Sequence, residues 1–183
     1  VDMVRTPTKE AALEKVLDAV NNTPEGTWIR GRGWDQNDWP ILEYPTAADL
    51  DKITQKHPVI FRRIDGHAAW ANSLAMDLAG LTQETKDVDG GIILRDKNGN
   101  PTGIFIDNAL DLIEAKIPPT SPDDIRRQIR KAQKLLNTLG LTSIHDAGTS
   151  KEAAAVLIAI IQTGVLSVRA YALRLNNPDD YEP

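Results

Sequence analysis

Leu141-Thr142-Ser143-Ile144-His145-Asp146 is a short apolar stretch that ends in polar residues, as a buried strand does. Residues 150–163 have the apolar spacing of a helix, and residues 165–175 again favour a strand. A strand, a helix and a strand at this spacing predict a βαβ unit with two neighbouring parallel strands. The last third of the chain is therefore predicted to have an α/β fold.

A long amphipathic helix is predicted before this unit, ending at Gly140. Ser121 is suited to cap it, and Pro122 fits the first helical position. The preceding Ile117-Pro118-Pro119 is typical of a linker. We therefore place a domain boundary near residues 115–121, which divides the chain into residues 1–118 and 119–183.

The first 118 residues predict a mixed α/β domain. Three helices are expected, at residues 8–21, 45–51 and 68–79. Thr8 and Thr46 are the expected caps of the first two. Strands are expected at residues 27–35 and 59–64. The pair Asn98-Gly99 separates two apolar runs, at residues 91–95 and 102–106, which should form an antiparallel hairpin.

The composition excludes several classes of protein. The 183 residues are 41% hydrophobic and include no Cys, which excludes thiol catalysis, Cys-ligated zinc and disulfides. The 26 Asp and Glu outnumber the 21 Lys and Arg, with no basic run, so no nucleic-acid partner is expected. The longest apolar run, residues 153–161, is too short to span a membrane. Because the chain begins at Val1, we expect it to be a piece of a longer protein whose targeting signal, if any, lies outside this sequence. A cytoplasmic location is expected for that protein.

Candidate site residues follow the predicted strands, because ligands of α/β folds gather at the carboxyl ends of parallel strands. The three places are Trp34-Asp35, Asp65-Gly66-His67 and His145-Asp146. His67 could donate to a substrate carbonyl or exchange a proton near neutral pH. It could equally cap a helix that begins at Ala68.

The other candidates also have structural interpretations. Asp146 could accept backbone donors in the turn at residues 147–149, and His145 beside it should face the other way. Asp35 could likewise have either a structural role in its turn or a role in the site. His57 precedes a proline and is expected to be solvated. The four tryptophans could line a pocket or pack in the core.

Metal-binding patterns are missing from the sequence. Its three histidines are scattered, with neither His-x-His nor His-Glu-x-x-His. We therefore expect no metal ligands in this chain.

Five motifs occur in a characteristic order: Gly31-Arg32-Gly33-Trp34-Asp35, the run from Arg62 to Ser73 containing Asp65-Gly66-His67, Gly90-Gly91 with Pro101-Thr102-Gly103, Asp107-Asn108-Ala109, and the run from Gly140 to Gly148. In this order they resemble the amidohydrolase family 3 branch of the amidohydrolase superfamily, which includes N-substituted formamide deformylases. The resemblance covers residues 28–175.

The resemblance implies a large hydrolase of non-peptide C–N bonds in amides and formamides. Its (β/α)8 barrel would hold one or two divalent metals, commonly zinc. Residues 1–118 would form an insertion, or lid, between barrel strands 1 and 2, and residues 119–183 would supply strands 2 and 3 with their helices. The family's metal ligands would fall outside this chain, which would be inactive by itself.

The same resemblance assigns roles to the candidates. His67 and Asp65 would be catalytic, and the substrate-binding residues would be Trp34, Asp35, His145 and Asp146. The implied partners are a small amide substrate and the rest of the barrel, and exposed apolar faces would favour self-association. The alternative is a stand-alone binding or structural module with no catalytic activity.

Overall fold

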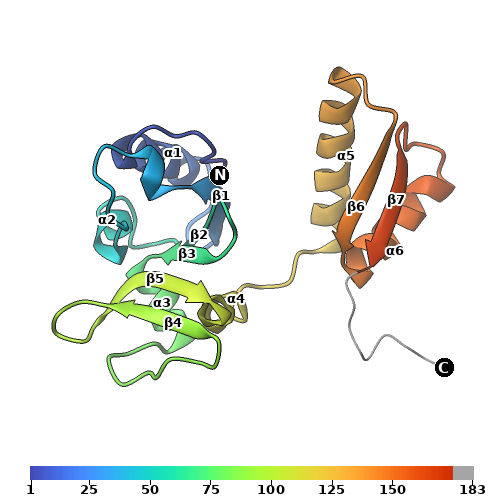
Figure 1. The fold of residues 1–183 in the computed structure, drawn as a ribbon. Coiled ribbons are helices and arrows are strands. Elements are labelled where there is room, and N and C mark those ends of the chain that lie inside the picture. Colours follow the sequence, from blue (N-terminus) through green and yellow to red (C-terminus); the bar gives the residue numbers. More distant parts are fainter. Residues whose placement is uncertain (175–183) are drawn as a thin grey trace. The chain divides into compact units, whose positions relative to one another are not determined.

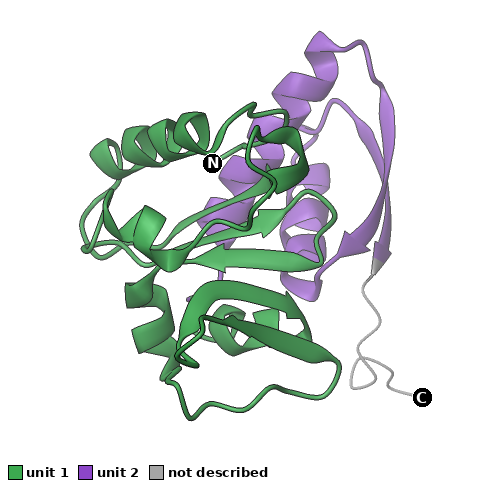
Figure 2. Ribbon diagram, turned by 60° about the vertical axis from the view of Figure 1, so that its left-hand side comes forward, with its two compact units in different colours: residues 1–117 green, residues 118–183 purple. Residues whose placement is uncertain are grey.

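The computed structural model describes residues 1–174 of the chain. It divides into two compact units, the first of residues 1–117 and the second beginning at Pro118 (Figure 2). The division falls within the linker expected from Ile117-Pro118-Pro119. Each unit has its own sheet and its own core.

Unit 1 is built on a five-stranded sheet (Figure 1). Its strands lie in the order β1 (Ile29–Trp34), β2 (Val59–Arg63), β3 (Ala68–Ala71), β5 (Pro101–Asp107) and β4 (Gly91–Arg95). β1 and β2 are parallel, and the other neighbours are antiparallel. The hairpin predicted around Asn98-Gly99 is confirmed by the pairing of β4 with β5.

Both faces of this sheet are buried, because successive side chains of a strand point to opposite sides. Phe61 and Trp70 pack in one core with Val16 of α1 (Lys9–Asn21). Ile60 packs in a second core with Met76 of α3 (Ser73–Ala79). The remaining helical segments of unit 1 are α2 (Ala47–Asp51), η1 (Gln36–Asp38), η2 (Asn108–Leu110) and α4 (Asp111–Glu114). The mixed α/β class predicted for this part is confirmed.

The predicted caps of the first two helices are confirmed. The Thr8 hydroxyl accepts a hydrogen bond from the Ala11 N–H at 3.0 Å. Thr46 and Asp49 form a capping box at the start of α2, in which the Asp49 carboxylate accepts from the Thr46 N–H at 2.9 Å. These bonds satisfy backbone donors that a helix start otherwise leaves free.

The helix predicted for residues 68–79 is wrong in its first half. Residues 68–71 form β3, which is buried on both faces between β2 and β5. Only residues 73–79 are helical, with Asn72 as the N-cap. A short apolar run that is buried all round has no periodicity to separate a strand from a helix, and Ala favours helices in isolation.

Unit 2 contains the predicted βαβ arrangement. Its elements are α5 (Pro122–Thr138), β6 (Ser143–Thr149), α6 (Lys151–Gln162) and β7 (Arg169–Arg174), and β6 pairs with β7 in parallel. The predicted cap of α5 is confirmed, since the Ser121 hydroxyl accepts from the Asp124 N–H at 3.1 Å. Leu175, the last residue of the predicted strand, lies outside the described residues.

The core of unit 2 lies on one face of this strand pair. Ile125 of α5 and Val156 and Ile160 of α6 form its buried cluster. Among residues 118–174, β6 and β7 pair only with each other. Across the part of the chain that the structure describes, every helix is too short or too polar to cross a membrane.

Candidate functional site

His67 lies on the turn between β2 and β3. Gly66 supplies the positive φ of 80° that this turn requires. One carboxylate oxygen of Asp65 accepts a hydrogen bond from the His67 N–H at 3.0 Å. The Asp65 side chain therefore fixes the backbone from which the imidazole projects. The helix-cap interpretation of His67 is wrong, because the residue precedes a strand.

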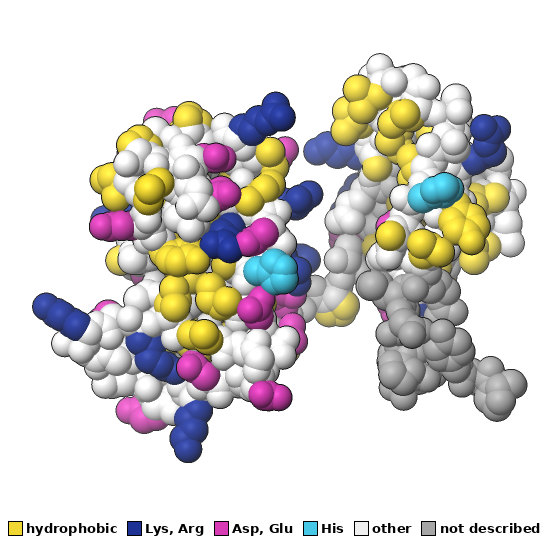
Figure 3. All heavy atoms as spheres, in the orientation of Figure 1, with side chains coloured by type: hydrophobic (Ala, Val, Ile, Leu, Met, Phe, Trp, Pro, Cys, Tyr) yellow, Lys and Arg dark blue, Asp and Glu magenta, His cyan; other side chains and the backbone are white. Residues whose placement is uncertain are grey.

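The imidazole of His67 is open to solvent and contacts a carboxylate. Its side chain is 71% exposed, and its Nδ1 lies 2.8 Å from Oδ1 of Asp107. In the space-filling view, a histidine on unit 1 is exposed beside acidic side chains (Figure 3). His67 and Asp107 thus form an exposed pair of side chains that a ligand can reach and that can exchange a proton.

The register of β3 and β5 brings these two residues together. Ala68 lies opposite Ile106, so His67 and Asp107 are the next pair along. The Asp107 N–H also donates to the His67 carbonyl at 2.9 Å. Directly opposite residues of antiparallel strands have neighbouring side chains. Sequence reasoning did not assign Asp107 as a site residue, because the contact spans 40 positions of the chain.

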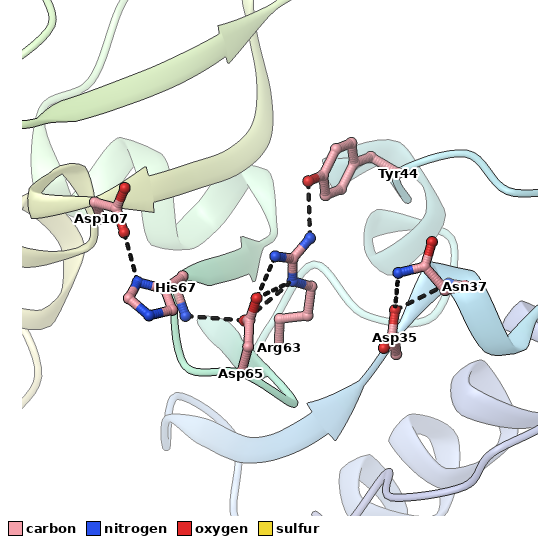
Figure 4. A network of polar contacts seen from close by, with 7 residues as sticks. All are labelled: Asp35, Asn37, Tyr44, Arg63, Asp65, His67 and Asp107. Atoms are coloured by element: carbon pink, nitrogen blue, oxygen red, sulfur yellow. Dashed lines mark hydrogen bonds and ion pairs between the residues drawn. The ribbon is translucent and has the colours of Figure 1, made fainter.

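Arg63 connects Asp65 to Tyr44. Its guanidinium donates to both carboxylate oxygens of Asp65, and its Nη1 donates to the Tyr44 hydroxyl at 2.9 Å. The hydrogen bonds from Arg63 hold the pKa of Asp65 below its ordinary value. Figure 4 shows the resulting chain of contacts from Asp107 through His67, Asp65 and Arg63 to Tyr44.

Asp35 is placed apart from this chain of contacts (Figure 4). Its carboxylate accepts from the Asn37 N–H at 2.9 Å and from the Asn37 side-chain amide at 2.8 Å, so it caps η1. Asp35 therefore has the structural role considered for it, as a helix cap. A contact with substrate stays a prediction.

Trp34 belongs to an aromatic cluster in the core. Its side chain is fully buried, and its Nε1 donates to the Phe61 carbonyl at 2.7 Å. The Trp34 ring lies 6.2 Å from the rings of both Trp39 and Trp70. Packing therefore explains these three tryptophans, and the expectation that Trp34 contacts substrate is not tested by this arrangement.

His145 and Asp146 of β6 point to opposite faces of their strand, as the alternation predicted. Asp146 lines a mainly apolar pocket under α5 and α6 and accepts from the Gly148 N–H at 3.2 Å and the Thr149 hydroxyl at 2.8 Å. His145 is exposed and meets Tyr171 edge-to-face, with ring centroids 5.3 Å apart. Asp146 thus has the structural role considered for it, and His145 remains open to a ligand.

His57 corrects another expectation. It is 4% exposed, with Nδ1 3.1 Å from the Thr27 carbonyl, so it is a buried residue and not a solvated one. The strand-like neighbours on its C-terminal side, including Val59, draw this loop into the core.

Metal ligands are not gathered at any of these places. Within residues 1–174, no group of three or more His, Asp and Glu side chains lies close enough to hold a metal ion. The described residues therefore do not form a complete metal centre by themselves.

Comparison with known proteins places the chain in a family. Residues 2–182 match the model of the amidohydrolase family. The chain belongs to the amidohydrolase family. Among curated relatives of the chain, "Protein LONG AFTER FAR-RED 3" of Arabidopsis thaliana is 41% identical over 140 residues, 76% of this chain and 24% of the relative. The N-substituted formamide deformylase of Arthrobacter pascens is 30% identical over 155 residues, 79% of this chain and 28% of the relative.

A solved structure agrees with this membership. The chain is similar to an uncharacterized metal-dependent hydrolase from Pyrococcus horikoshii OT3, with a TM-score of 0.64 and 27% sequence identity. The match covers 94% of this chain and 32% of that one. The chain thus spans about a quarter to a third of the length of these relatives.

Proposed function

We propose that these residues are part of a metal-dependent hydrolase that cleaves non-peptide C–N bonds of small amides or formamides. The observation that carries the proposal is the amidohydrolase family match over residues 2–182. The formamide deformylase among the relatives supports the bond type, and the metal-dependent hydrolase among the solved structures supports a divalent metal. We assign zinc as that metal, held by residues outside this chain.

Unit 2 is proposed to supply strands 2 and 3 of a (β/α)8 barrel. Residues 1–118 would form a lid that is inserted between barrel strands 1 and 2. Parallel sheets normally have several strands, with a βαβ crossover covering one face. β6 and β7 have such a crossover, while Tyr171 and Leu173 are 62% and 47% exposed. The rest of the barrel would cover these apolar side chains, and in the isolated chain they would favour self-association.

Within the lid, His67 is proposed to act on the substrate. Its exposed imidazole can donate a hydrogen bond to a carbonyl or pass a proton to a leaving amine. Asp65 would hold the turn that presents it, because it binds the His67 backbone. His145 would form part of the pocket wall. Substrate contacts by Trp34, Asp35 and Asp146 remain part of the proposal for the full-length protein.

The test is a kinetic comparison in the full-length protein that contains these residues. We expect His67→Ala to lower kcat for amide or formamide hydrolysis by about 10²- to 10⁴-fold, the range of general acid–base catalysis. Metal content should stay unchanged, because the ligands lie elsewhere. Lys97→Ala, on the exposed turn between β4 and β5, is the control and should keep full activity. Wild-type kinetics in His67→Ala would reject the catalytic role of His67.

A further inference from the structure

We propose that Asp107 is a positioning residue that fixes the tautomer of His67, so that His67 presents Nε2 to the substrate. The inference rests on the proposed role of His67 and extends it to the atom that does the chemistry. Three features of the structure carry it: the contact between the two side chains, the exposure of the ring, and the backbone conformation of Asp107.

The contact determines which nitrogen carries the proton. An ionised carboxylate can only accept hydrogen bonds, so the 2.8 Å contact from Asp107 Oδ1 requires a hydrogen on Nδ1 of His67. In the neutral ring Nε2 then has a free lone pair, and in the protonated ring it has a proton to give. With 71% of the His67 side chain exposed, Nε2 is the nitrogen left for a ligand.

The backbone of Asp107 indicates that an Asp at this position costs stability. Its φ of 47° and ψ of −126° lie outside the left-handed helical region in which Asp is tolerated. Such a conformation is typical of glycine at a turn. Glycine there would relieve the strain, but it would remove the carboxylate that holds His67. Strain of this kind gathers at functional sites.

Asp107→Gly therefore separates a positioning role from a structural one. In the present chain we expect its melting temperature to equal or exceed that of the wild type, because the backbone strain is removed. The ¹⁵N chemical shifts of the His67 imidazole, measured near pH 8.5 where imidazoles are ordinarily neutral, should change from the Nδ1–H form towards the Nε2–H form. Arg5→Gly is the matched control, since Arg5 also has a positive φ, of 56°. It should leave the His67 shifts unchanged.

The same substitution in the full-length protein connects the tautomer to catalysis. We expect Asp107→Gly to lower kcat at least about tenfold, by less than His67→Ala, since imperfect positioning costs less than removal of the catalytic group.

The outcomes distinguish the two proposals. Unchanged imidazole shifts in Asp107→Gly, or a clear fall in its melting temperature, would overturn the positioning role. A tautomer change in Asp107→Gly together with wild-type kcat in His67→Ala would overturn the catalytic role proposed for His67, while the assignment of Asp107 to the His67 ring would stand.

Discussion

At His67, two carboxylates act on different parts of one residue. Asp65 accepts from the backbone N–H, and Asp107 accepts from the ring. The first contact is local, and a carboxylate two positions before a backbone N–H is a familiar turn arrangement. The second depends on strand register, which the sequence does not reveal. His67 and Asp65 could therefore be proposed from the sequence, and Asp107 could not.

The buried capping carboxylate of Asp49 gives a pH-dependent prediction. Its side chain is 12% exposed and lies 3.3 Å from the Lys9 ammonium. Burial raises the pKa of Asp49, but the hydrogen bonds from Thr46 and the charge of Lys9 outweigh burial and hold the pKa below 3.8. The stability that this carboxylate contributes is thus present above pH 3.8 and is lost as the pH falls through its lowered pKa.

We expect Asp49→Asn to lower the free energy of unfolding by about 1 kcal/mol at pH 7, measured by urea denaturation. The difference from the wild type should shrink as the pH falls from 3.8 through the lowered pKa of Asp49, because the wild-type carboxylate then loses its charge. Asp77→Asn, an exposed position on α3, should change stability by no more than about 0.5 kcal/mol. An equal effect of Asp49→Asn at pH 7 and at low pH would refute the ionised cap.

Among the elements, the helix starts were predicted well and the central strand was not. Thr8, Thr46 and Ser121 cap their helices with local hydrogen bonds, which depend on residues only three positions away. β3 depends on β2 and β5 on either side of it. Its short Ala-rich sequence is decided by this tertiary context, so residue propensity gave the wrong element.

Asn72 joins β3 to α3 and is fully buried. Its Oδ1 accepts from the N–H groups of Val59 at 2.9 Å and Ala75 at 3.1 Å, and its Nδ2 donates to the His57 carbonyl at 3.0 Å. One side chain thus caps α3, completes the pairing beside β2 and holds the buried loop that contains His57.

Replacing Asn72 with Ala leaves these buried backbone groups without a partner. We expect Asn72→Ala to lower the free energy of unfolding by about 2–4 kcal/mol, since both a helix cap and buried hydrogen bonds are lost. Asn98→Ala, on the exposed hairpin turn, provides the matched control and should cost less than about 0.5 kcal/mol. A loss below 1 kcal/mol in Asn72→Ala would show that the loop and α3 are held by other contacts.

For the molecule as a whole, the order of motifs was more informative than any single residue. The motifs from Gly31 to Gly148 indicated the amidohydrolase family, and the family match over residues 2–182 confirms it. The mixed α/β class and the parallel pair of β6 and β7 also followed from the sequence. The proposed barrel does not follow in the same way, because its closure depends on strands that this chain does not supply.

Removal and return of metal in the full-length protein tests the proposed hydrolase most directly. The full-length protein would be treated with a chelator, assayed for amide and formamide hydrolysis, and assayed again after addition of Zn²⁺. We predict that hydrolysis is lost with the metal and restored by its return, whereas residues 1–183 alone show no hydrolysis in either state. Undiminished hydrolysis by the metal-free full-length protein would contradict the proposed function.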